Sequence, residues 1–456
     1  MKIVMCASEV VPFAKTGGLA DVAGALPLAL EKLNHEVIII MPKYKSISCP
    51  GEYATLGENI KVYFIENDAY FNRPGLYGEK TGDYPDNLDR FSFFSRKALD
   101  LLKKINYKPD CIHCHDWQTS LIPVYLKTIY KNKPFYKKIK TILTVHNIGY
   151  QGIFNKEEFP KLGLDWSLFN MEALEFYNKI NILKSGIIFS DVINTVSPTY
   201  SQEMMTKEQG FGLEGVLQKN KDKLFGILNG LDYDLWDPAK DNFIAKKYSS
   251  DSLQDKMINK TALQKECKLP LKENIPIFGF VGRLAEQKGI DLIEQVVEKI
   301  YQLSIQLVIL GTGDLKYHVL LEQIASKYPE QIRLYLKFDD PLAHRIYSGC
   351  DVFLMPSRYE PCGLGQMISF KYGTAVVARK TGGLADTVVN FNPLKDEGNG
   401  FVFQNPTHEG LLEAMLRAVL AYQDKKKWQA LMLRCSQLDF SWQESAKRYI
   451  ELYQKL

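Results

Sequence analysis

The chain has 456 residues, too many for a single hydrophobic core, which predicts two or three domains. Hydrophobic residues make up 46% of it and charged residues 24%, values ordinary for globular proteins, so the composition excludes a disordered or fibrous protein. With 57 basic and 53 acidic residues the net charge is +4, too even to indicate general binding to nucleic acid or membranes, although a locally basic cleft stays open.

The first segment, MKIVMCASEVVPFAK, is apolar but carries Glu9 and lacks a small-residue cleavage site, so it predicts a strand rather than a signal peptide. No run of about 18 apolar residues occurs, and we predict no membrane-spanning helix. The eight cysteines are scattered without a disulfide framework, which fits a reducing compartment. We therefore expect a cytoplasmic protein.

One cysteine pair has the spacing of a metal or redox site. Cys111 and Cys114 form a C-x-x-C in CIHCHDW, with His113 and His115 interleaved. A structural zinc ion normally takes four protein ligands, and no second C-x-x-C completes such a set, although the histidines leave a metal site open. The segment is also typical of a buried strand running into a helix, where free cysteines are common. We prefer this second interpretation and predict no metal.

In chain order, the first half alternates short apolar strands with longer helical stretches. Strands are predicted at residues 2–8, 35–42, 111–116, 141–147 and 191–197. Helices are predicted at residues 19–34 and 198–206. The strands are rich in Val and Ile and almost wholly apolar, as expected when helices cover both faces of a sheet. The alternation predicts a parallel, doubly wound α/β sheet.

Residues 237–274 interrupt this pattern. They are polar, rich in lysine and free of strong strands, and we predict a linker followed by a surface helix. The alternation then restarts with a helix at 289–303. Strands of this second half are predicted at residues 275–284, 305–314, 332–338, 350–357 and 373–380.

The pattern therefore predicts two α/β domains with a cleft between them. We place the N-terminal domain at residues 1–242 and the C-terminal domain at residues 243–438. Residues 439–456 contain the amphipathic segment WQESAKRYIELYQKL, which predicts a helix docked on one of the halves. We expect it to pack back on the N-terminal domain.

The heptad KTGGLAD occurs twice, at residues 15–21 and 380–386. In both copies Gly-Gly precedes an apolar segment that can start a helix, an arrangement that suits an anion or the sugar beside it. Lys15 adds a point charge that can reach a phosphate. A plain strand–helix turn would also need glycine, but two copies in two similar halves favour a shared ligand.

Two cations follow a predicted strand in FVGRLAEQKG. Arg283 and Lys288 stand near the strand end, where ligands of open α/β sheets bind. They are either surface charges or groups that neutralise a leaving diphosphate, and their position favours the second interpretation. The nearby LGTGDL lacks the third glycine of the dinucleotide fingerprint, which argues against a dehydrogenase.

Further polar groups stand in loops. Glu360 in MPSRYEPCGLGQM is suited to accept hydrogen bonds from a sugar diol, or to stabilise a helix N-terminus. His146 in TVHNIGYQG follows a strand as an acid–base group, a donor to a sugar or a polar turn residue. Asp116 in HCHDWQT is placed similarly, and NGLDYDLWDP supplies Asn229.

Taken together, KTGGLADV, HDWQT, TVHNIGYQG, NGLDYDLWDP, VGRLAEQKG, PSRYEPCGLGQM and KTGGLADTV resemble the bacterial glycogen synthases and plant starch synthases, the family-5 glycosyltransferases. The resemblance runs from residue 1 to the C-terminal helix, with the motifs in the expected order. It implies a GT-B fold of two Rossmann-like domains, the first on the acceptor side and the second binding the nucleotide sugar. It also implies transfer of glucose from ADP-glucose to the non-reducing 4-OH of an α-1,4-glucan, with retention and without a metal ion or cofactor. Neither nucleic acid nor a membrane is an implied partner.

The resemblance also implies roles for individual residues. The implied catalytic residues are His146, Arg283, Lys288, Glu360 and Asp116. The implied ADP-glucose-binding residues are Lys15, Gly17, Gly18, Asn229, Cys362, Gly363, Leu364, Thr381, Gly382 and Gly383. Arg283 and Lys288 match the pair on the diphosphate, and Gly382–Gly383 the loop beside the leaving phosphate. Ile368 occupies the position where many related retaining transferases carry a second Glu, so no role for a Glu pair is implied.

The implied reaction sets physical demands. Negative charge builds on the leaving diphosphate, so without a metal it needs fixed cations and N–H groups. Retention usually indicates a nucleophilic carboxylate, and none is evident, so we expect front-side attack with the departing phosphate taking the acceptor proton. The competing hypotheses are a UDP-glucose donor or another acceptor, and a silent glucan-binding or regulatory protein. The presence of Lys15, Arg283, Lys288 and Glu360 together argues against a catalytically inactive protein.

Overall fold

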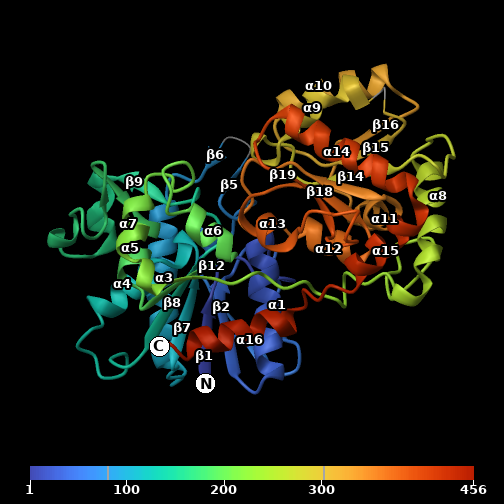
Figure 1. Cartoon of the computed structure of the whole chain (residues 1–456). Coiled ribbons are helices and arrows are strands. Elements are labelled where there is room, and N and C mark those ends of the chain that lie inside the picture. The colour runs from blue at the N-terminus through green and yellow to red at the C-terminus, as the bar shows by residue number, and fades with distance from the viewer. Residues whose placement is uncertain (80–81, 301–302) are drawn as a thin grey trace. The chain divides into compact units, whose positions relative to one another are not determined.

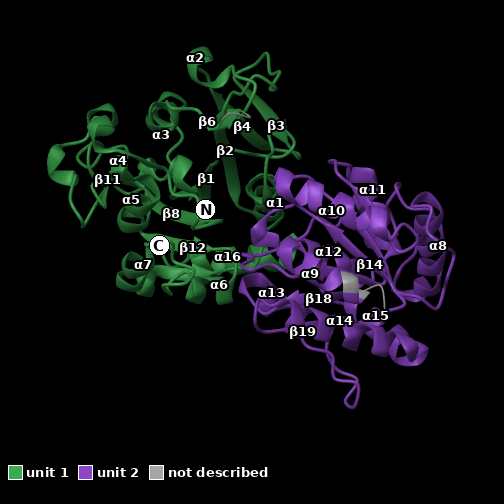
Figure 2. Ribbon diagram, turned by 90° about the horizontal axis from the view of Figure 1, so that it is seen from above, with its two compact units in different colours: residues 1–230, 442–456 green, residues 231–441 purple. Residues whose placement is uncertain are grey.

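The computed structural model describes residues 1–79, 82–300 and 303–456. These residues form two compact units, which Figure 2 shows in different colours. Unit 1 contains residues 1–230 and 442–456, and unit 2 contains residues 231–441. The chain therefore leaves unit 1 once and returns to it for its last helix.

Unit 2 begins earlier in the chain than the sequence indicated, because the segment after Leu231 is bonded to it. The Leu231 amide donates to the Phe440 carbonyl oxygen at 2.6 Å. The buried Asp241 carboxylate accepts hydrogen bonds from His344 Nδ1 at 2.8 Å and from the Tyr372 hydroxyl at 2.6 Å. These bonds fix onto unit 2 a stretch that the sequence placed in the N-terminal domain.

The main sheet in the described part of unit 1 has eight strands. Their order across the sheet is β13 (Leu224–Gly226), β12 (Val192–Thr195), β8 (Lys140–Val145), β7 (Cys111–His115), β1 (Lys2–Cys6), β2 (Glu36–Pro42), β4 (Ile60–Ile65) and β3 (Tyr53–Leu56). Neighbouring strands are parallel, except that β3 is antiparallel to β4. Strands β1, β7 and β8 are almost entirely buried, as their apolar sequences predicted.

The strand order of unit 1 reverses between β1 and β7. From β1 the sheet grows through β2 and β4 in one direction, and from β7 it grows through β8, β12 and β13 in the other. In open α/β sheets, ligands bind outside the carboxyl ends of the strands at such a switch point. The segments that follow Cys6 and His115 therefore start at the expected ligand-binding position of unit 1.

Unit 1 also contains α-helices, some of which pack directly on its sheet (Figure 1). They are α1 (Gly18–Lys32), α2 (Asp68–Phe71), α3 (Asn87–Lys104), α4 (Leu121–Lys127), α5 (Ile182–Phe189), α6 (Pro198–Glu203), α7 (Glu214–Lys219) and α16 (Trp442–Tyr453). The last of these, α16, packs against α1 and buries the stripe Trp442, Ala446, Tyr449 and Tyr453. These residues recur at the helical spacing that the amphipathic sequence shows.

Smaller elements complete unit 1 and lie in its loops. A three-stranded sheet contains β10 (Glu175–Phe176), β11 (Lys179–Asn181) and β9 (Ile153–Asn155). A two-stranded ribbon contains β5 (Gly78–Glu79) and β6 (Gly82–Asp83). The short 3₁₀ helices of the whole chain are η1 (Trp117–Thr119), η2 (Lys156–Leu162), η3 (Trp166–Leu168), η4 (Lys221–Lys223), η5 (Ser250–Asp255) and η6 (Glu286–Lys288).

The sheet of unit 2 has six parallel strands in the part of the chain that the structure describes. Their order is β16 (Ile332–Tyr335), β15 (Gln306–Leu310), β14 (Ile277–Val281), β17 (Val352–Met355), β18 (Ala375–Arg379) and β19 (Gly400–Phe403). Counted along the chain this is the Rossmann order 3-2-1-4-5-6, with its switch point between β14 and β17.

Helices α8 to α15 accompany this second sheet. They are α8 (Lys256–Glu266), α9 (Ile290–Ile300), α10 (Leu315–Lys327), α11 (Asp340–Gly349), α12 (Gly365–Lys371), α13 (Gly382–Thr387), α14 (His408–Gln423) and α15 (Lys425–Ser436). The helix predicted at 289–303 corresponds to α9, and residues 301–302 of that prediction lie outside the described residues. No helix in the described chain has both the length and the apolar character needed to cross a membrane.

Residues 237–274 contain the predicted helix, α8, and part of it is exposed, but not all of its lysines lie on the surface. Two lysines of α8 are buried. The Lys256 ammonium donates to the Ser348 carbonyl at 2.8 Å and to Thr374 Oγ1 at 2.7 Å, and burial lowers its pKa to about 8. Lys260 pairs with Asp351 at 2.8 Å. Lysine-rich composition suggested exposure, but acceptors inside unit 2 satisfy these ammonium groups.

Candidate functional site

Two residues predicted to be catalytic are in contact at the switch point of unit 2. Lys288 follows β14, and Glu360 follows β17. The Lys288 ammonium donates to Glu360 Oε2 at 2.6 Å, and Ser357 Oγ donates to the same oxygen at 2.9 Å. The Glu360 side chain is buried, whereas Lys288 remains partly exposed. A buried carboxylate thus fixes the position of a cation that can still reach a ligand.

Arg283, the other predicted cation of this loop, is exposed. Its guanidinium donates to Gln287 Oε1 at 3.0 Å. Gly289 follows Lys288 with φ +71°, and a Cβ there would lie 2.2 Å from the Pro356 carbonyl oxygen. Only glycine lets the chain pass so close to the end of β17. This contact holds the loop that carries both cations against the segment after β17.

The loop between Glu360 and α12 contains three residues predicted to bind the donor, and it is fixed from inside. The Gln366 side-chain amide donates to the carbonyl oxygens of Cys362 at 3.0 Å and Gly363 at 3.1 Å. Gly363 has φ +75°, a conformation that favours glycine. Cys362 is buried and Leu364 is half-buried. Sequence reasoning missed this role of Gln366. The available signal was a side-chain amide three residues after Gly363, close enough to bond to the carbonyl oxygens of the short loop.

The second KTGGLAD is a packing element. Gly382 has φ +42°, and a Cβ there would lie 2.0 Å from the Glu360 carbonyl oxygen. A Cβ at Gly383 would lie 2.1 Å from the Cys362 carbonyl oxygen. The Gly383 amide donates to the carbonyls of Glu360 and Pro361 at 3.1 and 3.2 Å. This amide is engaged within unit 2, and the threonine before the two glycines is buried.

The first KTGGLAD, after β1, is organised by a buried acid that sequence reasoning missed. Glu9 accepts hydrogen bonds from the Thr16 amide, from Thr16 Oγ1 at 2.6 Å and from the Gly17 amide at 3.2 Å. The Tyr77 hydroxyl donates to the same carboxylate at 2.6 Å. The Thr16 and Gly17 amides are therefore already bonded to an internal anion. The sequence did contain a signal for this role, because Glu9 is an acidic residue in an otherwise apolar segment that leads into the loop with Gly17 and Gly18.

The glycines of this first copy differ from those of the second. A Cβ at Gly17 or Gly18 would meet nothing within 4 Å, and neither residue has a positive φ. The fold around Gly17 and Gly18 therefore does not require glycine. A ligand that approaches the backbone closely would explain why glycine occupies both positions. Lys15 is exposed, and its ammonium donates to Asp21 Oδ1 at 2.7 Å. The two identical heptads thus have different structural roles.

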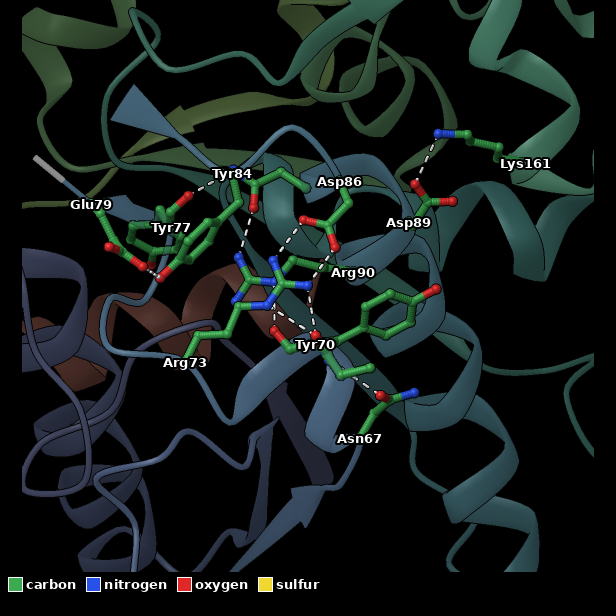
Figure 3. Close-up of polar contacts among 12 residues, drawn as sticks. Asn67, Tyr70, Arg73, Tyr77, Glu79, Tyr84, Asp86, Asp89, Arg90 and Lys161 are labelled. Atoms are coloured by element: carbon green, nitrogen blue, oxygen red, sulfur yellow. Dashed lines mark hydrogen bonds and ion pairs between the residues drawn. The ribbon is translucent and has the colours of Figure 1, made fainter. Parts of the chain in front are cut away.

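The loop that carries Tyr77 is held by buried arginine contacts (Figure 3). Arg90 donates to the carbonyl oxygens of Tyr70 and Leu76 at 2.7 and 2.9 Å, and its side chain is fully buried. Arg73 forms a two-bond ion pair with Asp86, at 2.7 and 2.6 Å. Such paired, planar contacts fix geometry strongly. They hold Tyr77 in place against the carboxylate that organises the first KTGGLAD.

Three histidines form a connected row at the carboxyl ends of β7 and β8. The rings of His113 and His115 stack with centroids 4.3 Å apart, and His115 Nδ1 lies 3.0 Å from His146 Nε2. His113 Nδ1 lies 2.8 Å from the Tyr453 hydroxyl of α16, and its Nε2 lies 2.7 Å from Thr144 Oγ1. Sequence reasoning weighed His113 and His115 only as metal ligands.

Burial keeps these rings neutral. It lowers the pKa of His113 and of His146 to about 3, and it lowers the pKa of His115 well below the ordinary value. His115 Nε2 is buried and has no hydrogen-bond partner among the described residues. Near neutral pH the row therefore consists of uncharged imidazoles that can donate or accept hydrogen bonds.

Asp116 lies between the row and its loops in a strained conformation. Its φ is +56°, which is uncommon for a residue other than glycine. Asp116 Oδ1 accepts a hydrogen bond from the His146 amide at 2.7 Å. Burial raises the pKa of this carboxyl to about 7, against the opposing effect of backbone hydrogen bonds. The structure thus brings Asp116 and His146 together, with the acid holding the backbone of the histidine.

Asn229, the remaining predicted residue of unit 1, follows the edge strand β13. Its side chain is buried, and within the described chain its Oδ1 has no hydrogen-bond partner. A buried acceptor without a partner is costly in a folded protein. A hydroxyl or amide of a ligand would satisfy it.

The C-x-x-C in β7 is structural. Cys111 and Cys114 are buried free thiols, and burial raises the pKa of Cys111 to about 12, which disfavours the thiolate a metal needs. Across residues 1–79, 82–300 and 303–456, no group of three or more His, Cys, Asp or Glu side chains is placed to hold a metal ion.

Comparison with known proteins identifies the family. The model of the starch synthase catalytic domain matches residues 2–219, and that of the group 1 glycosyl transferases matches residues 263–430. A glycogen synthase from Geotalea daltonii is 49% identical, over 99% of this chain and 98% of the relative. One from Fervidobacterium nodosum is 46% identical, over 100% and 99%. The chain belongs to the glycogen synthase and starch synthase family.

Two solved structures agree with the fold described above. The catalytic domain of starch synthase IV from Arabidopsis thaliana, bound to ADP and acarbose, is 36% identical with a TM-score of 0.90, over 99% of this chain and 98% of that one. A sucrose-phosphate synthase from Thermosynechococcus elongatus, at 17% identity and a TM-score of 0.65, shares the fold. The fold is GT-B, and the family and fold class predicted from the motifs are confirmed.

Proposed function

We propose that this chain elongates an α-1,4-glucan by transferring glucose from ADP-glucose to the non-reducing end, with retention at the anomeric carbon. One observation carries the assignment of roles: in each unit, residues of the family motifs lie beyond the carboxyl ends of strands at or beside the switch point. In unit 2 these include Lys288 and Glu360, and in unit 1 they include Lys15, Asp116 and His146. That is where open α/β sheets bind ligands.

The cations of unit 2 serve the leaving group. As the glycosidic bond of ADP-glucose breaks, negative charge builds on the diphosphate. Lys288, fixed by Glu360 and Ser357, and the exposed Arg283 supply positive charge that needs no reorganisation at that moment. Glu360 therefore fixes the position of the Lys288 ammonium, and it also adjoins residues 362–364, which we expect to bind the donor. We assign ADP-glucose rather than UDP-glucose as the donor because the related starch synthase IV structure contains ADP.

His146 donates a hydrogen bond to the glucose from Nδ1. One of His115 Nδ1 and His146 Nε2 must carry the proton that they share across 3.0 Å. If His146 supplied it, His115 would carry a hydrogen on its buried, unpartnered Nε2, and orphaned buried N–H groups are rare. His115 is therefore the donor to His146, which leaves the His146 proton on Nδ1. A histidine in this state is a hydrogen-bond donor and not a general base.

The carboxylates of unit 1 are poorly suited to be nucleophiles. Both oxygens of Glu9 already accept hydrogen bonds, from the Thr16 and Gly17 amides, from Thr16 Oγ1 and from the Tyr77 hydroxyl. Burial raises the pKa of Asp116 to about 7, so a large fraction of this carboxyl is protonated near neutral pH, and a protonated carboxyl is a poor nucleophile. This supports retention by front-side attack, in which the departing phosphate oxygen takes the proton of the acceptor hydroxyl. We place the reaction in the cytoplasm, where the eight free thiols remain reduced.

The assignment is tested with purified protein, glycogen and either ADP-glucose or UDP-glucose. We expect polymer growth with ADP-glucose, and a kcat lowered about 10²- to 10³-fold in Arg283→Ala and in Lys288→Ala, because each loses a charge that stabilises the transition state. Lys380→Ala is the matched control, since it removes the exposed lysine of the second KTGGLAD. Release of nucleotide from neither donor would refute the transferase, and near-normal turnover in both variants would refute the roles of the two cations.

A further inference from the structure

Three aromatic side chains are exposed on neighbouring loops of unit 1. Tyr150 is 53% exposed, Tyr177 is 80% exposed and Phe211 is 45% exposed. We call these three residues the aromatic platform. The mechanism above uses none of them, and exposed aromatic groups that gather on a surface are typical of a binding site.

Two of the three are held in an unfavourable backbone conformation. Tyr177 has φ +49° and Phe211 has φ +52°, in the left-handed region that bulky side chains rarely adopt. Tyr177 and Asn178 form the two-residue turn between β10 and β11, where Asn-Gly is the favoured pair. Phe211 precedes Gly212, which also has a positive φ. The backbone conformation of these turns does not call for an aromatic residue at either position, so we look for a use of the two rings on the surface.

The loops of the platform are in contact with one another. A Cβ at Gly212 would lie 3.0 Å from Phe176 Cζ and 3.9 Å from Tyr177 Cε2, so the turn after Phe211 lies against the hairpin. A Cβ at Gly149 would lie 3.7 Å from the Phe211 ring. The three exposed residues therefore belong to one continuous surface.

A buried amide pair fixes this arrangement. The Gln151 side chain donates to the carbonyl oxygens of Phe211 and Ile148, both at 3.0 Å. Asn181 at the end of β11 donates to Gln151 Oε1 at 2.6 Å. Both amides are buried. The lysine of α5 reinforces the hairpin, because the Lys184 ammonium donates to the Glu175 carbonyl.

The platform is continuous with the loop that carries His146. Tyr150 is in the segment TVHNIGYQG, and the Gly149 amide donates to Asn147 Oδ1 at 2.9 Å within it. Gln151 of the same segment holds the Phe211 turn. A ligand that reaches His146 and extends along this surface would therefore meet the three rings in turn.

We propose that Tyr150, Tyr177 and Phe211 bind the body of the α-glucan chain whose end receives glucose. Glucose units present flat C–H faces that stack on aromatic rings, and their hydroxyls bond to tyrosine and asparagine at the edges. Rings on separate, rigid loops suit successive units of a flexible polymer, which pays less ordering entropy on a pre-organised surface. The proposal rests on the proposed function, which supplies a glucan acceptor.

The test replaces the two strained aromatic residues by asparagine, which tolerates a left-handed backbone and should leave folding intact. In the double variant Tyr177→Asn/Phe211→Asn we expect about tenfold weaker co-sedimentation with glycogen, measured without any donor. The KM for glycogen should rise by a similar factor, whereas the KM for ADP-glucose and the turnover at saturating glycogen should change less than about twofold. Phe338→Asn is the control, because that ring is 86% exposed in unit 2.

Wild-type affinity for glycogen in the double variant would overturn the proposal. If that result came with a change in oligomeric state on size-exclusion chromatography, it would indicate that the rings contact a second copy of the chain instead. Because co-sedimentation needs no nucleotide sugar, a protein that binds glycogen through the platform but fails to transfer glucose would refute the proposed function alone.

Discussion

The donor state that we propose for His146 depends on a neighbour, His115, that is not among the residues proposed to contact the substrate. His115 is fully buried, stacked on His113 and bonded to His146, so it acts as a positioning residue. A histidine whose second nitrogen is engaged has its tautomer set by that bond. At this scale, one proton on one nitrogen decides whether His146 donates to a sugar or accepts from it.

Replacing His115 separates this role from simple packing. We expect His115→Leu to lower kcat about tenfold or more, because His146 is then free to take the other tautomer. His115→Asn places an N–H donor near the former Nδ1 and should recover most of the activity. Long-range ¹H–¹⁵N correlation spectra of the seven histidines report the tautomer directly. A His146 protonated on Nε2 in the wild type would contradict the assignment, whatever the kinetics show.

At the scale of elements, identical sequence does not mean identical use. The first KTGGLAD leads into α1 with open space around Gly17 and Gly18, whereas the second leads into α13 with its glycines packed on backbone carbonyls. The first copy is organised by Glu9, and the second by its contacts with the loop after β17. Ligand access explains glycine in one copy, and close packing explains it in the other.

Alanine substitutions distinguish these two uses. Gly17→Ala should leave the free energy of unfolding unchanged within about 0.5 kcal/mol, because the new Cβ meets nothing, but it should lower activity by crowding the substrate. Gly383→Ala should destabilise unit 2 by roughly 1–3 kcal/mol, because the new Cβ meets the Cys362 carbonyl. Urea unfolding and turnover of both variants check this. Equal losses of stability would contradict the distinction.

Helix α16 shows how an element far along the chain supports the site. The Tyr453 hydroxyl lies 2.8 Å from His113 Nδ1, and the Tyr449 hydroxyl accepts a hydrogen bond from Asn194 Nδ2 at 3.2 Å. The last helix therefore reaches buried polar groups of strands β7 and β12. The amphipathic pattern predicted the helix. It could not predict these contacts, because a tyrosine on an apolar stripe looks the same whether its hydroxyl finds a buried partner or solvent.

For the whole molecule, the sequence was sufficient for the strand–helix alternation, the two α/β halves and the family. Apolar strands and glycine loops carry those signals locally. The residues that organise the site were harder to find. Glu9 and His115 bond to positions far along the chain or across strands, and lysines such as Lys260 are buried despite a polar sequence. Such pairings depend on tertiary contacts, which the spacing of residues in the sequence does not predict.

The buried histidines also give the protein a defined response to acid. The pKa values of His113 and His146 are lowered to about 3, and that of His115 is lowered well below its ordinary range, against about 6.5 in an unfolded chain. Below pH 6.5 the unfolded histidines bind protons that the folded ones do not, so the free energy of unfolding falls as the pH falls towards 3. His113 and His146 each contribute roughly 1 kcal/mol per pH unit in that window, and His115 acts in the same direction.

Asp116 acts in the opposite direction. Its pKa is raised to about 7, so between pH 7 and about 3.8 the folded state holds a proton that the unfolded state lacks, and acid stabilises it there. The three histidines outweigh this one carboxyl, so acid still lowers the free energy of unfolding of this region below roughly pH 6. Hydrogen exchange of the β7 and β8 amides measures this opening free energy. His113→Gln should make this free energy fall less steeply as the pH falls, by roughly 1 kcal/mol per pH unit. An unchanged slope in His113→Gln would show that this ring is protonated in the folded state.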